Sequence, residues 1–370
     1  MLLEKIDLRH LSIPLKEPFT TSFETKRHIE HVLVTVSGDG IEGYGECTCN
    51  QTPYYINETT GTAWHILSEF IAPYVVGSRI ESAADLLNAP RFSSVRGNYF
   101  AKAGLELAVQ DLLARAKSVS LASMLGGTRR RIESGVSIGV QESAGALFAK
   151  IDAFLGQGYK RIKLKIKPGK DYDVLAAVRE RFPELPLMAD ANSAYTLADI
   201  PMLRKLDGLH LMMIEQPLHF TDIVDHATLQ KELRTPICLD ESIHSTEDAR
   251  KALDLGSCRI VNIKIGRVGG VNEAKKIHDI CVSRDIPVWC GGMHEYGIGR
   301  AHNIAIASLP GFTLPGDIAG SDKYWREDIV DPPFIVKDGT LEVPEGPGIG
   351  VIPVKERVEK YTVAKRTFTI

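Results

Sequence analysis

Short apolar runs recur through the second part of the chain, and each is followed by a stretch with a helical pattern. Eight such runs predict strands that begin near residues 133, 161, 185, 209, 235, 259, 286 and 311. The spacing of about 25 residues suits one strand, one helix and two short loops. Alternating strands and helices indicate a parallel sheet, and eight repeats predict a closed (β/α)8-type barrel.

The residues before this repeat have a different pattern. Alternation of apolar and polar residues predicts strands at 31–40 and 41–48, and longer apolar stretches predict helices at 62–76 and 99–117. These elements indicate an α+β domain in front of the barrel. Beyond the barrel, a hairpin turn is expected at 337–339, where the sequence is Lys-Asp-Gly.

We therefore expect an α+β capping domain over 1–127, a (β/α)8-type (modified TIM) barrel over 128–318, and a C-terminal segment over 319–370 that returns to the capping domain. The alternative for the barrel is a doubly wound parallel sheet. That fold usually has a Gly-rich phosphate-binding turn after its first strand, and no G-x-G-x-x-G motif follows VSIGV at 136–140. The barrel is therefore the preferred prediction.

The composition is that of a globular chain of 370 residues, with 25% charged residues and a formal net charge of -3. There is no basic excess of the kind that binds nucleic acid. The N-terminal stretch carries Glu4, Lys5 and Asp7, and no apolar run approaches the length of a membrane span. We expect a cytoplasmic protein that acts on small molecules, with no nucleic-acid or membrane partner.

Ionisable residues stand at the ends of five consecutive predicted strands. They are Lys165, Asp190, Glu215, Asp240 and Lys264. The first four follow one another at intervals of 25 residues, and the last comes 24 residues later. Because the carboxyl ends of barrel strands meet at one mouth, we expect these side chains to converge there.

The two-residue period of a strand decides which side chains share a face. Lys163 and Lys165 have the same parity and are expected to point into the barrel, whereas Leu164 and Ile166 have the opposite parity and should pack under the helices. The same alternation places Ser137 on the inner face of the first barrel strand. This segment therefore predicts a row of cations in the lumen.

Three carboxylates on neighbouring strands would repel one another in a partly desolvated mouth, so a cation is expected among Asp190, Glu215 and Asp240. These are hard oxygen donors without a histidine or thiolate, a set that favours Mg2+, with Mn2+ also possible. Asn192 is placed as a further polar contact. Glu241 is either a supporting residue or itself a ligand.

Lys165 and Lys264 lie four strands apart in an eight-stranded barrel, so they should face each other across the metal. Burial and nearby positive charge, including that of Lys163, are expected to lower the lysine pKa from about 10.4. A neutral lysine could then remove a proton next to a carboxylate, and the metal would stabilise the resulting enediolate. Two opposed lysines permit racemisation, and one acting alone permits a syn elimination of water.

These residues resemble the enolase superfamily, in its muconate-lactonising subgroup, and most closely the o-succinylbenzoate synthase / N-succinylamino acid racemase family. A Lys base combined with Mg2+ is a known pattern of enolase-superfamily sites. The matching stretches cover nearly the whole chain. They are PFTTSF (18–23), KLKIKPG (163–169), DANSAYT (190–196), IEQPL (214–218), CLDES (238–242), NIKIGRVGG (262–270), WCGGM (289–293), GIGRAHNIA (297–305) and PGD (315–317).

The resemblance implies roles for individual residues. The three acids would bind Mg2+, Lys165 and Lys264 would form the acid/base pair, and Lys163 would assist electrostatically. The capping domain would shape specificity through loops near 18–25 and 48–60. The implied substrate-binding residues are Phe19, Phe23, Tyr55, Ser137, Gly291 and Met293, and Arg267 supports the site as in relatives with racemase activity. Cap packing is the alternative for the three aromatics, an ion pair for Lys163, and a packing role for Ser137.

The implied activity is that of a Mg2+-dependent o-succinylbenzoate synthase. It would dehydrate 2-succinyl-6-hydroxy-2,4-cyclohexadiene-1-carboxylate in menaquinone biosynthesis, and it would also racemise N-succinylamino acids. The racemase as the main role is one alternative, and a dipeptide epimerase is another, although only Asp317 stands where that branch carries two acids. The small-molecule partner is a carboxylate, and a homo-oligomer is expected.

Two further readings fit less well. An acid-sugar dehydratase would have an acid, not Lys264, on the sixth strand, and a non-catalytic binding protein would not need two opposed lysines. The chain also departs from its relatives at GGMHEY (291–296), where they usually read GGMLE. His294 and Tyr296 are expected near the mouth, where they would alter the pocket.

Overall fold

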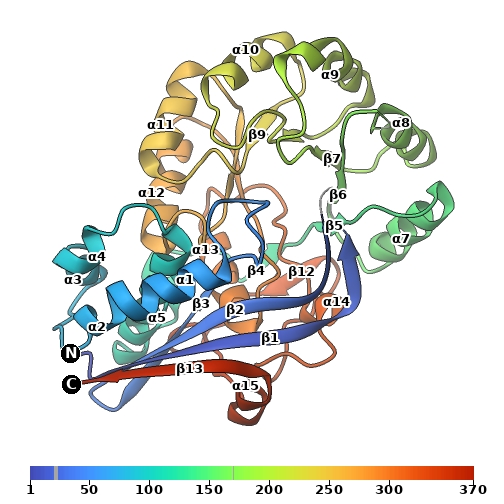
Figure 1. Cartoon of the computed structure of the whole chain (residues 1–370). Helices are drawn as coiled ribbons and strands as arrows, with labels where there is room; N and C mark the ends of the chain where they lie inside the picture. Colours follow the sequence, from blue (N-terminus) through green and yellow to red (C-terminus); the bar gives the residue numbers. More distant parts are fainter. Residues whose placement is uncertain (21–23, 170) are drawn as a thin grey trace.

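The computed structural model describes residues 1–20, 24–169 and 171–370. A four-stranded antiparallel sheet in the order β13-β1-β2-β3 joins the two ends of the chain (Figure 1). Its strands are β1 (Lys5–Thr20), β2 (Thr25–Gly38), β3 (Ile41–Cys47) and β13 (Thr362–Thr369). The turn between β2 and β3 is made by Asp39 and Gly40, both with positive φ, as a tight hairpin requires.

Helices cover one face of this sheet. They are α1 (Thr60–His65), the π-helical η1 (Ile66–Ile71), α2 (Ala72–Val75), α3 (Ala83–Leu87), α4 (Pro90–Ser93) and α5 (Tyr99–Ala116). The helix predicted at 62–76 therefore forms in three pieces, whereas the one predicted at 99–117 is continuous. Gly45 lets α5 lie directly on β3, because a Cβ there would stand 2.2 Å from the carbonyl oxygen of Gly104.

Seven parallel strands curl into the barrel in the order β11-β10-β9-β8-β7-β6-β5. They are β5 (Val136–Ile138), β6 (Ile162–Lys165), β7 (Leu187–Asp190), β8 (Ile214–Glu215), β9 (Ile237–Leu239), β10 (Ile260–Ile263) and β11 (Val288–Cys290). Helices lie outside these strands (Figure 1). They are α7 (Ala144–Gly156), α8 (Asp171–Arg181), α9 (Ile200–Leu206), α10 (Val224–Glu232), α11 (Thr246–Leu255), α12 (Val271–Val282) and α13 (Gly297–Ala307), with short 3-10 turns η2 (Leu197–Asp199) and η3 (Asp207–Leu209).

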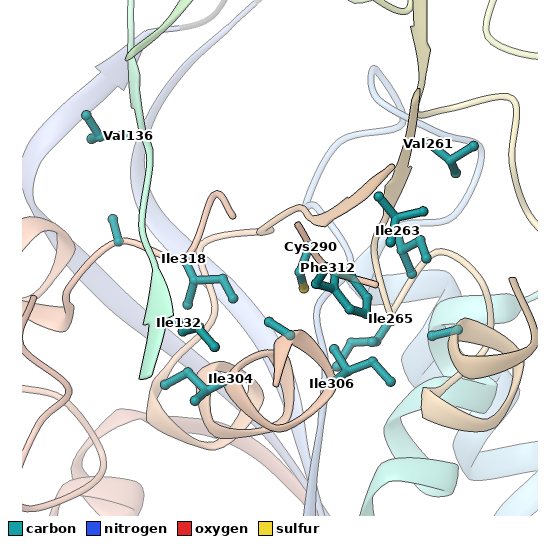
Figure 2. Close-up of a cluster of buried hydrophobic side chains, with 14 of the residues drawn as sticks. Ile132, Val136, Val261, Ile263, Ile265, Cys290, Ile304, Ile306, Phe312 and Ile318 are labelled. Atoms are coloured by element: carbon teal, nitrogen blue, oxygen red, sulfur yellow. The ribbon is translucent and has the colours of Figure 1, made fainter. Parts of the chain in front are cut away.

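The eighth predicted strand, near 311–317, is not a regular strand. Isolated bridges join Phe312 to Val288 on one side and Gly316 to Ser134 on the other. Pro315 lacks a backbone N–H, so it cannot donate to a sheet ladder. The segment nevertheless closes the barrel, and Figure 2 shows Phe312 beside Cys290 and near Ile306 of α13.

The C-terminal segment crosses back to the first sheet. It contains α14 (Ser321–Tyr324), β12 (Thr340–Glu342), which pairs with β4 (Arg131–Glu133), then α15 (Lys355–Tyr361) and finally β13. Asp338 and Gly339 have positive φ and Lys337 bridges to Thr340, which confirms the predicted hairpin turn. The boundaries at 127 and 318 stay predictions.

Buried carboxylates of the capping domain contact the starts of two barrel helices. Glu46 of β3 accepts hydrogen bonds from the backbone N–H groups of Tyr296 (2.9 Å) and Gly299 (2.7 Å) at α13. Glu106 of α5 accepts from those of Val271 (3.0 Å) and Asn272 (3.1 Å) at α12. These contacts set the cap over the barrel mouth. Within the described residues, no helix is long and apolar enough to cross a membrane.

Candidate active site

The strand register brings the predicted acids and lysines to one level of the barrel. Lys165 pairs across from Asp190, and Asp190 across from Glu215, in directly adjacent strands. Leu164 and Ile166 are buried in the apolar cluster around the barrel, on the opposite face from Lys163 and Lys165. The predicted side-chain parity of this strand is therefore confirmed.

Lys165 lies beside the third barrel strand. Its Nζ donates to Oδ2 of Asp190 at 2.7 Å and to Oδ1 of Asn192 at 2.6 Å. Asn192 in turn donates through Nδ2 to Oε1 of Glu241 at 3.0 Å. The amide thus joins the lysine to a second buried carboxylate, and Asn192 and Glu241 stand where the sequence placed them as supporting residues.

Lys163 lies deeper and bridges three acids. Its Nζ is 3.2 Å from Asp190, 3.0 Å from Glu215 and 3.0 Å from Asp317, and it lies 5.1 Å from the centre of the Trp289 ring. Burial alone would lower the pKa of Lys163, but the three carboxylates hold it well above the usual value. The cationic form of Lys163 is therefore favoured by these acids at the floor of the site.

Lys264 occupies the opposite wall. Its Nζ donates to Oδ2 of Asp240 at 2.8 Å and to the Tyr55 hydroxyl at 3.0 Å. The Tyr55 hydroxyl also donates to Oδ1 of Asp240 at 3.1 Å, so a cap side chain reaches this carboxylate. Arg267 is fully buried, pairs with Asp240 and donates to the backbone oxygens of Ile243 and Asn262. Arg267 therefore holds the Lys264 side of the site in place.

The charges of the acids and lysines are strongly coupled. Burial raises the pKa of Glu215 to about 7, with the neighbouring Asp190 adding to the effect. Burial would also raise the pKa of Asp190, but Lys165 and Lys163 keep it below its usual range. The pKa of Lys264 is raised because Asp240 outweighs burial. The sequence predicted a lowered pKa for this lysine. A lowered pKa requires that another cation, instead of Lys264, neutralises Asp240.

The donor set fits a hard cation, although the ammonium groups now lie between the carboxylates. Within 1–20, 24–169 and 171–370, no three His, Cys, Asp or Glu side chains are arranged closely enough to hold a metal ion. Buried oxygens are nevertheless left without a hydrogen-bond partner, namely Oε2 of Glu241 and Oδ1 of Asn262. Carboxylate and amide oxygens are hard donors that suit Mg2+.

These side chains surround a cavity of about 80 Å3 under the capping domain. It is lined by eight of the predicted residues: Phe19, Tyr55, Ser137, Lys163, Lys165, Asn192, Lys264 and Met293. Gly291 stands behind Lys264, where a Cβ would meet the lysine Cε at 2.8 Å. Phe23 lies outside the described residues.

Five further residues line the cavity, and the sequence did not predict them individually as site residues. They are Lys26, Asn50, Gly292, Asp317 and Tyr324. Lys26 of β2 donates to Oδ1 of Asn50 at 2.6 Å, and the Ser137 hydroxyl donates to Oδ2 of Asp317 at 2.7 Å. Asp317 was weighed only as a lone acid of an epimerase. No local pattern marked Lys26, because its strand has no repeat that relates it to the barrel.

The two residues that were expected near the mouth have different outcomes. His294 has φ of 63° and lines the cavity, with its ring 4.7 Å from that of Phe19 and 5.0 Å from that of Tyr324. Burial keeps its pKa well below the usual range, so it is a neutral wall residue. Tyr296 does not line the cavity. Its buried hydroxyl donates to the backbone oxygen of Ile29 at 2.6 Å and joins the two domains.

A barrel with acids at the ends of three successive strands, lysines on facing strands and an antiparallel capping domain defines an enzyme of the enolase superfamily. The enolase C-terminal domain-like family model matches residues 146–357. The model of the mandelate racemase / muconate lactonizing enzyme N-terminal domain matches residues 5–126. The chain belongs to the mandelate racemase / muconate lactonizing enzyme family, and the resemblance inferred from its motifs is confirmed.

Similar proteins carry two kinds of name. An "o-succinylbenzoate synthase" of Geobacillus kaustophilus is 54% identical over 99% of this chain and 97% of its own length. An "N-succinylamino acid racemase" of Thermus thermophilus is 49% identical over 97% of each chain. The crystal structure of an enolase-superfamily member from Listeria innocua superposes with a TM-score of 0.96 at 44% identity, covering 100% of this chain and 99% of the other.

Proposed function

We propose that this chain is a Mg2+-dependent o-succinylbenzoate synthase that also racemises N-succinylamino acids. The observation that carries the proposal is the position of Lys165 and Lys264 in one cavity, each against a carboxylate of a different strand. Both activities begin with removal of a proton next to a carboxylate. Relatives with either name support the pair of activities.

The synthase reaction needs one base and one fixed cation. Lys165, in its neutral form, takes the proton from the carbon next to the substrate carboxylate. The electron pair left on that carbon expels the neighbouring hydroxyl, and Lys165 returns the proton so that water departs. Lys264 remains an ammonium ion and stabilises the negative charge of the intermediate. The ring becomes aromatic, which favours the forward direction.

The racemase reaction uses the same two residues as a pair. One lysine removes the α-proton from one face of an N-succinylamino acid, and the other delivers a proton to the opposite face. Arg267 and Tyr55 hold the Asp240 and Lys264 side in place for both directions. The racemase as the main role therefore stays the first alternative.

Mg2+ is part of the proposal, and Asp190, Glu215 and Asp240 would hold it, with Mn2+ as a substitute. When bound, the metal supplies positive charge to the substrate carboxylate as the enediolate forms. Removal of divalent cations by EDTA should abolish activity, and added Mg2+ should restore it. Asp190→Asn should not respond to added Mg2+ at the concentration that restores the wild type. Full activity in EDTA would remove the metal from the proposal.

A dipeptide epimerase fits less well. Asp317, the acid expected to help hold a substrate amino group, lies 3.0 Å from Lys163 and 3.6 Å from Arg161. Two cations already neutralise it. The proposal also includes the cytoplasm as the place of the reaction. It further includes a homo-oligomeric state, and size-exclusion chromatography tests that state.

A paired assay of the purified protein with Mg2+ tests the proposal. One arm follows ring absorbance as the cyclohexadiene substrate dehydrates, and the other follows α-proton exchange of several N-succinylamino acids in D2O. Rapid dehydration with slow exchange would assign the synthase as the main role, and the reverse would assign the racemase. Activity in neither arm would contradict both.

A further inference from the structure

A second cavity adjoins the one that holds the lysine pair. Its volume is about 310 Å3, against about 80 Å3 for the catalytic cavity, and Phe19, Ser137 and Tyr324 line both. Pockets that enclose a small organic ligand usually measure about 300 Å3 or more. An amino acid that carries a four-carbon acyl arm therefore needs more room than the catalytic cavity provides, and the adjoining cavity lies where such an arm can extend.

Lys323 of α14 lines this second cavity. The half-buried ammonium donates to the backbone oxygen of Ser137 at 2.9 Å and to the Tyr324 hydroxyl at 3.2 Å. It also lies 4.7 Å from the ring centre of Tyr324, 5.6 Å from that of Phe154 and 6.0 Å from that of Phe19. The groups that this ammonium contacts are therefore neutral or aromatic, and the acids Glu17 and Asp322 line the same cavity.

Within the described part of the chain, no carboxylate lies at ion-pair distance from Lys323. Asp317 is the acid with the largest electrostatic effect on Lys323, and it is already paired with Lys163 and Arg161. Lys150, on the rim of the same cavity, has Glu17 at 3.6 Å. Burial lowers the pKa of Lys323, because the charged form has lost water without gaining an ion-pair partner, and an entering carboxylate would supply that missing counter-charge.

We propose that Lys323 determines specificity by binding the remote carboxylate of the substrate's acyl arm in the second cavity. The substrate class is a carboxylate whose side arm ends in a second carboxylate, such as a succinyl group. The inference rests on the proposed function and adds a residue and a place for the arm. The aromatic faces cover part of the ammonium, and a lower local dielectric strengthens the charge interaction.

The test compares two substrates that differ only in the charge at the end of the arm. N-succinyl and N-acetyl derivatives of the same amino acid are given to the wild type and to Lys323→Met, and KM and kcat are measured by α-proton exchange in D2O. We expect kcat/KM for the succinyl substrate to fall at least tenfold, mainly through KM, with little change for the acetyl substrate. Lys323→Arg should restore most of the loss. Lys231→Met, at an exposed position of α10 that lines neither cavity, should leave kcat/KM for both substrates unchanged.

The outcomes separate the two proposals. If Lys323→Met lowers kcat/KM equally for both substrates, or for neither, while the wild type remains active, the proposed role of Lys323 is wrong and the proposed function stands. If the wild type exchanges neither substrate, the racemase part of the proposed function fails, and the role of Lys323 toward N-acyl substrates fails with it, whereas the synthase is judged by dehydration alone. Thermal unfolding shows whether each variant is folded. If Lys323→Met is unfolded, Lys323→Arg is used in its place to test the role of Lys323.

Discussion

The two lysines proposed as bases are each paired with a different acid. Lys165 pairs with Asp190 and Lys264 with Asp240, so neither is free to act as a base until its carboxylate is neutralised by another cation. Lys163 bridges several acids and cannot readily lose its proton. Proton transfer in this site therefore depends on which cation neutralises each carboxylate.

Removal of either lysine should affect the two faces of the substrate differently. In Lys165→Ala, dehydration and α-proton exchange from one enantiomer should fall by roughly 10²–10⁴-fold, because the base on that face is missing. Lys264→Ala should lose exchange from the opposite enantiomer. NMR in D2O with separate enantiomers measures both. Lys167→Ala, at an exposed position two residues beyond the end of β6, should retain full activity.

A loss of equal size for both enantiomers in each variant would contradict the assignment of one lysine to each face.

Gly291 is expected to be intolerant of a side chain. A Cβ would stand 2.4 Å from Oδ1 of Asn262 and 2.8 Å from Cε of Lys264, so Gly291→Ala must displace the lysine. We expect kcat/KM to fall at least about tenfold, which corresponds to about 1.4 kcal/mol. Gly208→Ala makes the same chemical change where no atom lies within 4 Å, and steady-state kinetics should show no effect. Equal kinetics in the two variants would show that Lys264 has room to move.

Secondary-structure elements place these residues through two kinds of contact. The register of the parallel strands places Lys165, Asp190 and Glu215 at the same level along the barrel. Helix starts are held by acids of the capping domain, and a carboxylate at a helix N-terminus satisfies N–H groups that have no partner within the helix. The α5 to α12 contact made by Glu106 is one example.

Glu106 should give the protein a measurable pH dependence of stability. Burial raises the pKa of Glu106 to about 7 in the folded chain, above the value of about 4.3 in an unfolded one. The folded state therefore binds more protons between these values, and the contribution of Glu106 to the free energy of unfolding is full below about pH 4.3 and lost as the pH rises towards 7.

Glu106→Gln should remove this loss, because the amide keeps an acceptor and cannot ionise. Denaturant unfolding at pH 5 and pH 8 should show a decline in stability smaller than that of the wild type by on the order of 1–3 kcal/mol. Glu356→Gln, at an exposed position of α15, should decline like the wild type. An unchanged decline in Glu106→Gln would mean that Glu106 is ionised at both pH values.

The whole molecule builds one site from both domains. Phe19 and Tyr55 come from the capping domain and line the same cavity as the barrel lysines. Glu46 holds the domains together, since it contacts two N–H groups of α13 and lies 2.6 Å from Nδ1 of His31. The position of the cap is therefore part of the active site.

Loss of Glu46 should weaken both the fold and substrate binding. In Glu46→Ala, two buried N–H groups and His31 lose their acceptor, and each unsatisfied group costs about 1–3 kcal/mol. We expect a lower unfolding midpoint and a higher KM. Glu4→Ala, an exposed glutamate of the same domain, serves as the control in thermal unfolding and kinetics. A Glu46→Ala protein with the stability and KM of this control would show that other contacts dock the cap.

The amino-acid sequence by itself determined the repeated strand and helix units, the inner faces of the strands and the residues at their ends. These features follow from periods of 2, 3.6 and about 25 residues, and such periods depend on local backbone geometry. Leu164 and Lys165 illustrate this, because their parity alone placed one outside and the other inside the barrel. The family motifs lie on these same units.

Only the tertiary structure decided how distant segments meet. It closed the barrel with bridges at Phe312 and Gly316, paired the first strand with the last, and moved Tyr296 to the domain interface. It also brought Lys26 and Lys323 to the two cavities. These contacts join residues far apart in the chain, and no local period relates such residues, because their meeting depends on how the packed domains fill space.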